Sequence, residues 1–194
     1  MRLRSYDLSQ LRVLIIDDNK HMQLMIKEIL RSFNIRMLQT ADDGADALKL
    51  LKTYSTDLII CDWNMAPLDG IAFVEMVRKS NDSTNPEVTV IMLTGHTEYN
   101  RVMAARDAGV NTFLAKPVSP SALYARIVHC IEDNRLFIRN RLFYGPDRRR
   151  AKVKLAVPYK GPERRSGAGG PPSPSAAPSD RPLTQAEVEA LLGG

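Results

Sequence analysis

The sequence has little of what secreted and membrane proteins depend on. It contains only two cysteines, and neither Cys61 nor Cys130 has the spacing of a metal site or of a disulfide framework. The apolar run at residues 13–16 is far shorter than the roughly 20 residues that a membrane-spanning helix needs. The N-terminus also lacks the apolar centre of a signal peptide. We therefore expect a cytoplasmic protein, without a transmembrane segment, whose cysteines are small core side chains.

Acidic residues are scarce in one part of the chain. Residues 135–165 hold 11 lysines and arginines against 2 acids, whereas residues 1–134 hold 15 against 17 and residues 166–194 hold 1 against 3. The sequence pI of about 9.3 therefore reflects one short stretch. A basic stretch of this kind indicates an anionic partner.

The first 140 residues alternate short apolar runs with longer amphipathic stretches, as β-α units do around a parallel sheet that is buried on both faces. The runs are residues 13–17, 35–40, 58–62, 88–93 and 112–115. We expect an α/β fold, a (βα)5 doubly wound parallel sheet of the flavodoxin-like strand order 2-1-3-4-5. Ser119 and Pro120 predict the N-cap and first residue of a last helix, which we expect to extend to about residue 142.

Five polar side chains fall where the predicted strands end, namely Asp17, Asp18, Asp62, Thr94 and Lys116. A single aspartate there is more often a cap or a turn residue, but ligands in such sheets bind beyond the carboxyl ends of the strands. The three carboxylates among them form an all-oxygen cluster, which suits Mg²⁺. A metal and an ammonium would neutralise a phosphoryl group while a carboxylate attacks it. The proline after Lys116 is compatible with a cis bond.

The peptide Asp62-Trp63-Asn64-Met65, followed by Pro67 and Asp69-Gly70, resembles the CheY-like receiver family and especially its single-domain chemotaxis members. The resemblance covers residues 10–140. It implies a response regulator in which Asp62 accepts phosphate from a histidine kinase or phosphotransfer protein. It also implies that Mg²⁺ is bound by Asp17, Asp18, Asp62 and the main-chain carbonyl of Asn64, with Thr94 and Lys116 holding the phosphoryl group.

Two further positions have a meaning in that family. Phe113, three residues before Lys116, matches the aromatic switch that turns inward as Thr94 moves toward the phosphate, although a core aromatic fits it as well. His96 stands where the family tunes the lifetime of the phosphorylated state.

The basic stretch contains a repeat. Tyr144-Gly145-Pro146-Asp147-Arg148-Arg149 is echoed by Gly161-Pro162-Glu163-Arg164-Arg165, with Tyr159 ahead of the second copy. Guanidinium groups pair with phosphate and with guanine, tyrosines stack on bases, and a carboxylate accepts from the N–H groups of guanine. Cyclic di-GMP offers two guanines and two phosphates to such groups.

The repeat also resembles the arginine-rich tail of the CheY-like cyclic di-GMP effectors. In that resemblance the candidate contacts are Arg139, Arg141, Tyr144, Asp147, Arg148, Arg149, Glu163, Arg164 and Arg165. The alternative is a plain phosphorelay receiver whose tail tethers it to nucleic acid or membrane by non-specific charge. The remaining chain is too short for a helix-turn-helix, so we expect no sequence-specific DNA binding. Nor do we expect an enzyme, because no further nucleophile-base pair is present.

The end of the chain divides into two parts. Residues 166–182 are rich in Gly, Pro, Ser and Ala, which predicts a disordered linker. Residues 183–194 predict a short amphipathic helix, with Thr184 and Glu187 as a capping box. This segment resembles the peptide by which a flagellar switch protein recruits a chemotaxis regulator. We therefore expect a receiver domain at 10–142, a nucleotide-binding tail at 143–165, the linker, and a helix that docks in cis, in trans, or not at all. The implied output is protein contact in flagellar, motility or adhesion machinery.

Overall fold

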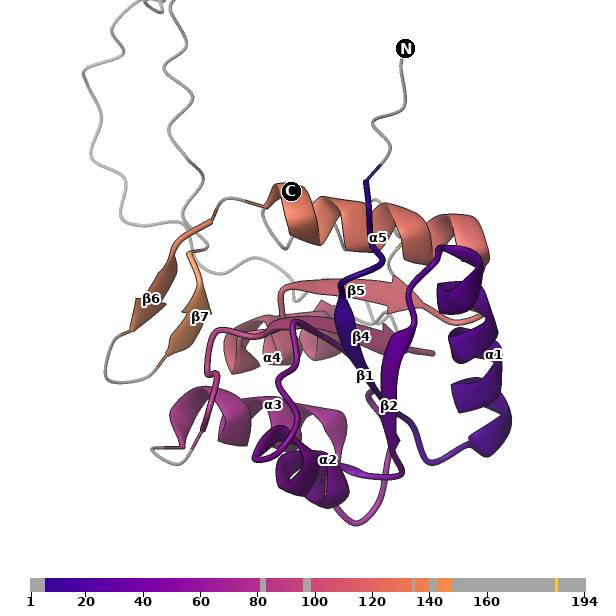
Figure 1. Ribbon diagram of the computed structural model, residues 1–194. Helices are drawn as coiled ribbons and strands as arrows, with labels where there is room; N and C mark the ends of the chain where they lie inside the picture. Colours follow the sequence, from indigo (N-terminus) through magenta and orange to yellow (C-terminus); the bar gives the residue numbers. More distant parts are fainter. Residues whose placement is uncertain are drawn as a thin grey trace, which may run out of the picture.

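A five-stranded parallel sheet with the order β2-β1-β3-β4-β5 forms the centre of the protein (Figure 1). The computed structural model describes residues 6–80, 83–95, 99–133, 135–139 and 143–147, together with Thr184. The strands are β1 (Arg12–Ile16), β2 (Met37–Ala41), β3 (Leu58–Asp62), β4 (Thr89–Thr94) and β5 (Thr112–Ala115). The predicted fold class and strand order are confirmed. The predicted runs 58–62 and 112–115 coincide with β3 and β5, and the other three lie within two residues of the observed strands.

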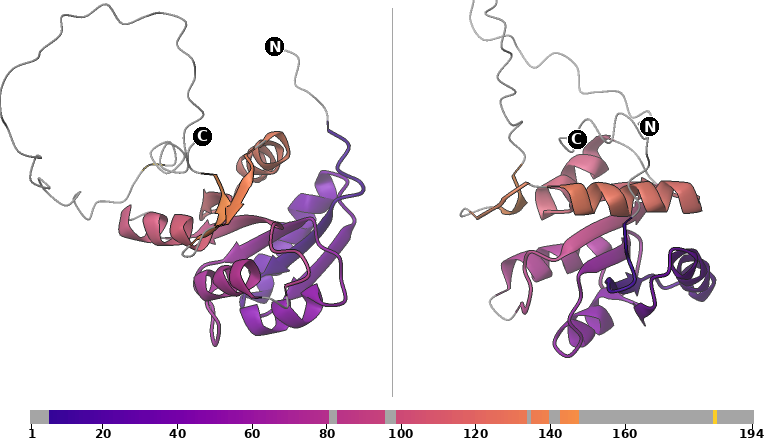
Figure 2. Two further views of the ribbon diagram at one scale, coloured as in Figure 1. Left: turned by 90° about the vertical axis from the view of Figure 1, so that its left-hand side faces the viewer. Right: turned by 45° about the horizontal axis from the view of Figure 1, so that its top comes forward.

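Helices cover both faces of the sheet (Figures 1 and 2). They are α1 (Lys20–Ser32), α2 (Gly44–Leu51), α3 (Gly70–Lys79), α4 (Tyr99–Ala108) and α5 (Pro120–Glu132). Alternate residues of β1 point to opposite faces. Val13 and Ile15 pack in the core that contains α1 and α5, whereas Leu14 and Ile16 pack in the core that contains α2, α3 and α4. The strands are therefore buried on both sides, as their unbroken apolar runs predict.

Polar side chains cap the helices where the chain leaves the carboxyl edge of the sheet. The side chain of Asn19 accepts from the backbone N–H groups of His21 and Met22 at the start of α1. Asp43, Asp69 and Ser119 cap α2, α3 and α5 in the same way. The predicted N-cap at Ser119, with Pro120 following it, is confirmed. Each cap satisfies backbone donors that the first helical turn leaves without partners.

The predicted extension of the last helix to residue 142 is wrong. Helix α5 ends at Glu132, where Asp133 takes an extended conformation. The Asp133 carboxylate accepts from the backbone N–H of Arg135 at 3.0 Å and from its guanidinium at 2.7 Å. Aspartate side chains compete in this way with helical hydrogen bonds. The chain then forms an antiparallel hairpin of β6 (Phe137–Arg139) and β7 (Tyr144–Pro146), which stands beside the central sheet in Figure 1.

A buried arginine fixes this hairpin to the domain. Arg78, near the end of α3, is only 2% exposed. Its guanidinium donates to the carbonyls of Pro86 and Gly109 at 2.7 and 3.1 Å, to the side chain of Asn111 at 3.0 Å, and lies 5.1 Å from the centre of the Phe137 ring. Burial lowers the pKa of Arg78 to about 10, so the group is still charged at neutral pH. The hairpin thus covers the Arg78 guanidinium, whose N–H groups donate to acceptors in the loops before β4 and β5.

A close backbone contact completes the seat of the hairpin. Gly109 has a φ of +96°, and a Cβ atom there would lie 2.6 Å from the Tyr144 carbonyl. A Cβ atom on Gly145 would lie 2.9 Å from the Cα of Gly109. Glycine is the residue that accepts both the positive φ and this close approach. The Gly-Pro of the first repeat therefore has a packing role in this fold.

The predicted linker at 166–182 and helix at 183–194, Thr184 excepted, lie outside the described residues. Within the described part of the chain, no helix is long and apolar enough to cross a membrane. Both cysteines are free, and burial raises the pKa of the Cys61 and Cys130 thiols, the latter to about 12.

Replacing Arg78 by alanine is expected to lower the free energy of unfolding by about 2–4 kcal/mol, because it strands buried carbonyl acceptors and removes the packing under Phe137. Urea unfolding measures the change. Arg31→Ala is the matched control, since Arg31 forms an exposed ion pair with Glu28, and such pairs contribute less than about 1 kcal/mol. Equal effects of the two replacements would contradict the role given to Arg78.

Candidate functional site

Three carboxylates meet at the carboxyl edge of the sheet. Asp17 and Asp18 directly follow β1, and Asp62 is the last residue of β3, the neighbouring strand. One oxygen from each carboxylate lies within 4.8 Å of the other two. Asp17 is fully buried and Asp62 is 6% exposed, whereas Asp18 faces solvent. The parallel sheet brings together acids that are far apart in the sequence because both strands end at the same edge.

Lys116 supplies positive charge to this acidic cluster. Its Nζ lies 3.0 Å from Oδ1 of Asp62 and 3.5 Å from Oδ2 of Asp17. The backbone holds the lysine in place, since its N–H donates to the Thr94 carbonyl at 2.8 Å. The Lys116–Pro117 peptide bond is cis, the isomer that the sequence allows there. The five predicted strand-end residues thus lie on one edge, on loops and strand ends of β1, β3, β4 and β5.

The charges in the cluster do not balance. Burial raises the pKa of Asp17, and the neighbouring charge of Asp62 adds to this rise, while the N–H of Asn19 and the Lys116 ammonium oppose it. One ammonium faces three carboxylates. All-oxygen donors at this spacing suit a hard divalent cation, so the residues present fit Mg²⁺. Asn64 lies two residues beyond Asp62, in the exposed bend after β3.

Asp62 is oriented through one of its two oxygens. The backbone N–H of Trp63 donates to Oδ1 at 2.8 Å, and Lys116 approaches the same atom. Thr94, the last residue of β4, is 2% exposed. Phe113 is 1% exposed, and its ring centre lies 6.4 Å from that of Trp63. Phe113 therefore occupies a buried position beside the residue that follows Asp62.

Comparisons with known proteins agree with this geometry. The family model described as "Response regulator receiver domain" matches residues 13–128. The chain belongs to this family. Chemotaxis protein CheY-3 of Vibrio cholerae is 32% identical over 117 residues, which cover 60% of this chain and 88% of that protein. Chemotaxis protein CheY of Pseudomonas aeruginosa is 32% identical over 122 residues, covering 63% and 97%.

The solved structures include a similar receiver. Chemotaxis protein CheY4 of Vibrio cholerae superposes with a TM-score of 0.58 at 28% identity, covering 62% of this chain and 98% of that chain. The receiver domain here has the acidic pocket of Asp17, Asp18, Asp62 and Lys116 that phosphorylation requires. Membership of the family makes the chain a receiver-domain response regulator and implies a histidine kinase as its partner.

The predicted nucleotide contacts are only partly described. Arg139 and Tyr144 are opposite residues in the β6–β7 hairpin, and the Arg139 guanidinium lies 5.6 Å from the centre of the Tyr144 ring. Asp147 follows β7, and its N–H donates to the Leu136 carbonyl at 2.8 Å. The other predicted contacts lie outside the described residues, as does His96. They are Arg141, Arg148, Arg149, Glu163, Arg164 and Arg165.

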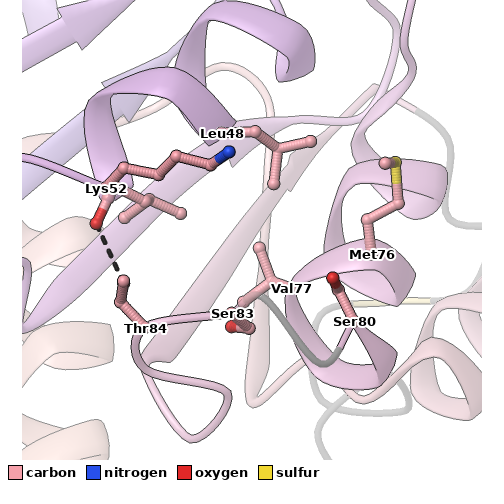
Figure 3. Close-up of a pocket in the computed structure, with 8 residues that line it drawn as sticks. Leu48, Lys52, Met76, Val77, Ser80, Ser83 and Thr84 are labelled. Atoms are coloured by element: carbon pink, nitrogen blue, oxygen red, sulfur yellow. Dashed lines mark hydrogen bonds between the residues drawn. The ribbon is translucent and has the colours of Figure 1, made fainter.

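A hollow of about 180 Å³ lies between α2 and α3 (Figure 3). Leu48, Leu51, Met76 and Val77 supply its apolar wall, and Lys52 is the ionisable residue among the described residues that line it. Thr84 closes one side by donating to the Leu51 carbonyl at 2.9 Å. The hollow lies toward the C-terminal ends of the two helices, at the opposite end of the strands from the acidic cluster. None of the described residues that line it is an acid.

Arg78 and the contacts by which the hairpin packs on the domain were not identified from the sequence. A signal for Arg78 was present, since it follows Val74 by four residues and therefore falls on the apolar stripe of α3 with Val77. An arginine on such a stripe indicates a buried cation with partners. The N–H of Trp63, in contrast, is a backbone group, and residue identity carries no information about its direction.

Trp63 offers a direct test of the metal site because it is the only tryptophan of the chain and its N–H bonds Asp62. Titration with Mg²⁺ is expected to change tryptophan fluorescence in a saturable way and to raise the unfolding temperature, since a ligand of the folded state stabilises it. Asp17→Asn and Asp62→Asn should abolish both responses. Asp46→Asn, at a half-exposed acid on α2, should retain them, and an unchanged titration of Asp17→Asn would rule out this site.

Proposed function

We propose that this protein is a two-component response regulator that accepts a phosphoryl group on Asp62 and binds cyclic di-GMP through its arginine-rich tail. The observation that carries the first half is the pairing of the nearly buried Asp62 carboxylate with Lys116 at 3.0 Å, beside two further acids. The second half is supported by the repeat of Gly-Pro, an acid and two arginines. Output is by protein contact, and the chemotaxis function of the named relatives favours a motility target.

The proposed transfer is an in-line displacement. Among the described contacts, both donors to Asp62 approach Oδ1, which leaves Oδ2 to attack the phosphorus of a phosphohistidine. A P–O bond forms as the P–N bond breaks, and the imidazole of the kinase leaves. Asp17, Asp18, Asp62 and the Asn64 carbonyl would hold Mg²⁺, which when bound would neutralise charge on the transferred group. Lys116 and the Thr94 hydroxyl hold the oxygens of the transferred group.

Phe113 is proposed to report the modified state. Its ring packs near Trp63 and in the same apolar core as Val102 and Ala105 of α4. Helix α4 follows Thr94 after a short loop. A movement of Thr94 toward the phosphoryl group therefore changes the surroundings of a ring that packs with α4.

Asp62 is expected to be the one acid of the chain that accepts the phosphoryl group. With acetyl phosphate and Mg²⁺, the wild-type protein should gain one phosphoryl group and Asp62→Asn should gain none. Lys116→Ala should be phosphorylated about tenfold more slowly, because it loses the cation that faces the developing charge. Intact-mass spectrometry measures the gain. Asp46→Asn should behave as wild type. Modification of Asp62→Asn at the wild-type rate would refute the assignment.

Cyclic di-GMP is expected to bind the full chain more tightly than GTP or a DNA oligonucleotide does, and calorimetry measures this order. Arg148→Ala with Arg149→Ala should abolish binding and leave Asp62 competent. The matched control is Lys152→Ala with Lys154→Ala, which removes the same charge outside the repeat. Equal losses in both double variants, or equal affinity for DNA, would favour a non-specific polyanion tether instead.

A further inference from the structure

The hairpin carries a ladder of cations and rings. Starting from the interior, Arg78 lies 5.1 Å from the centre of the Phe137 ring. Phe137 meets Tyr144 edge to face, with ring centres 6.1 Å apart at 78°. Arg139, which is exposed, lies 5.6 Å from the centre of the Tyr144 ring. The inner end of the ladder is buried, and its outer end faces solvent.

A carboxylate of the receiver domain stands beside the outer end. The Tyr144 hydroxyl donates to Oε1 of Glu87 at 2.9 Å, and Glu87 is a residue of the loop before β4. Glu87 is 57 residues away from Tyr144 in the sequence. The fold therefore brings a guanidinium plane, an aromatic face and a carboxylate from three segments to one place.

The Tyr144 ring is held in a fixed orientation. Its hydroxyl is bonded to Glu87, Phe137 packs against it, and the following residue, Gly145, is in close contact with Gly109. A ring that is already positioned loses little freedom when a ligand stacks on it. Arg139, in contrast, is a long exposed side chain over that ring, and such a side chain is free to move outward.

The spacing suits the insertion of one flat base. Flat groups in contact lie about 3.5 Å apart, so a base between the guanidinium and the ring needs about 7 Å. The present 5.6 Å separation has to grow by only about one to two ångströms. A base in that position would be stacked by Tyr144 and by Arg139, and its edge would lie on the side of the tyrosine hydroxyl, where Glu87 is.

The carboxylate distinguishes the bases. The Watson–Crick edge of guanine presents N–H donors at N1 and N2, and an ionised carboxylate is an acceptor only. Adenine presents the N1 lone pair on the same edge, which a carboxylate repels. We propose that Glu87, Arg139 and Tyr144 form a guanine-base site, so that the receiver domain itself reads one base of the dinucleotide. This inference rests on the cyclic di-GMP binding proposed above.

The test compares two ligands on full-length variants. Calorimetry with cyclic di-GMP and cyclic di-AMP gives a preference ratio for wild type, Glu87→Gln and Glu75→Gln. The last is a matched control on α3, a half-exposed acid that pairs with Lys79. Glu87→Gln is expected to reduce the guanine preference roughly tenfold or more, the size expected for one bidentate contact. Glu75→Gln should leave the ratio unchanged.

The ratio separates recognition from general electrostatics. Removing a negative charge strengthens the binding of any anionic ligand, but this change is equal for the two dinucleotides. Tyr144→Phe keeps the ring and releases Glu87, so it should lower the preference several-fold while retaining binding. A wild-type ratio in Glu87→Gln overturns the guanine site and leaves the proposed function standing. A wild-type chain that binds neither dinucleotide overturns both.

Discussion

The repulsion among three carboxylates at one edge of the sheet is the constraint on which the function of this protein depends. Asp17 and Asp62 are buried beside one ammonium, and Asp18 adds a third charge within 4.8 Å. The apolar strands β1 and β3, buried on both faces, hold this arrangement against its own electrostatic cost. A site that lacks neutralising charge is prepared for Mg²⁺ and for a phosphoryl transfer that spreads negative charge over several oxygens.

The two proposed inputs lie at opposite ends of the strands. Asp62 and Thr94 end β3 and β4 at the carboxyl edge, whereas the hairpin sits on the loops that precede β4 and β5. Helix α4 connects the two ends in the sequence: it follows Thr94, and Gly109, against which the hairpin packs, follows α4. Phe113 belongs to the same apolar core as Val102 and Ala105 of this helix. A displacement of α4 would therefore reach both the phosphorylation edge, through Thr94, and the hairpin, through Gly109.

Local patterns predicted the parts of this structure that depend on local physics. Apolar runs located the strands, and Ser119 with Pro120 located the start of α5, because burial and capping leave a mark on neighbouring residues. The rule that ligands bind beyond the carboxyl ends of parallel strands then predicted that Asp17, Asp62 and Lys116 lie close together. The end of α5 and the hairpin were not predictable in this way. They depend on Asp133 bonding Arg135 and on Arg78 beneath Phe137, and these contacts give no periodic signal in the sequence.

The packing of the hairpin on Arg78 also determines where the folded receiver unit ends. The family model ends at residue 128, yet Arg78, inside that boundary, is covered by Phe137 from beyond it. The segment that the family model matches is therefore shorter than the segment needed to cover Arg78. A fusion that joins a new output module at residue 128 would inherit an uncovered guanidinium. A receiver fragment that keeps Arg78 covered therefore has to extend through the hairpin, to about residue 147.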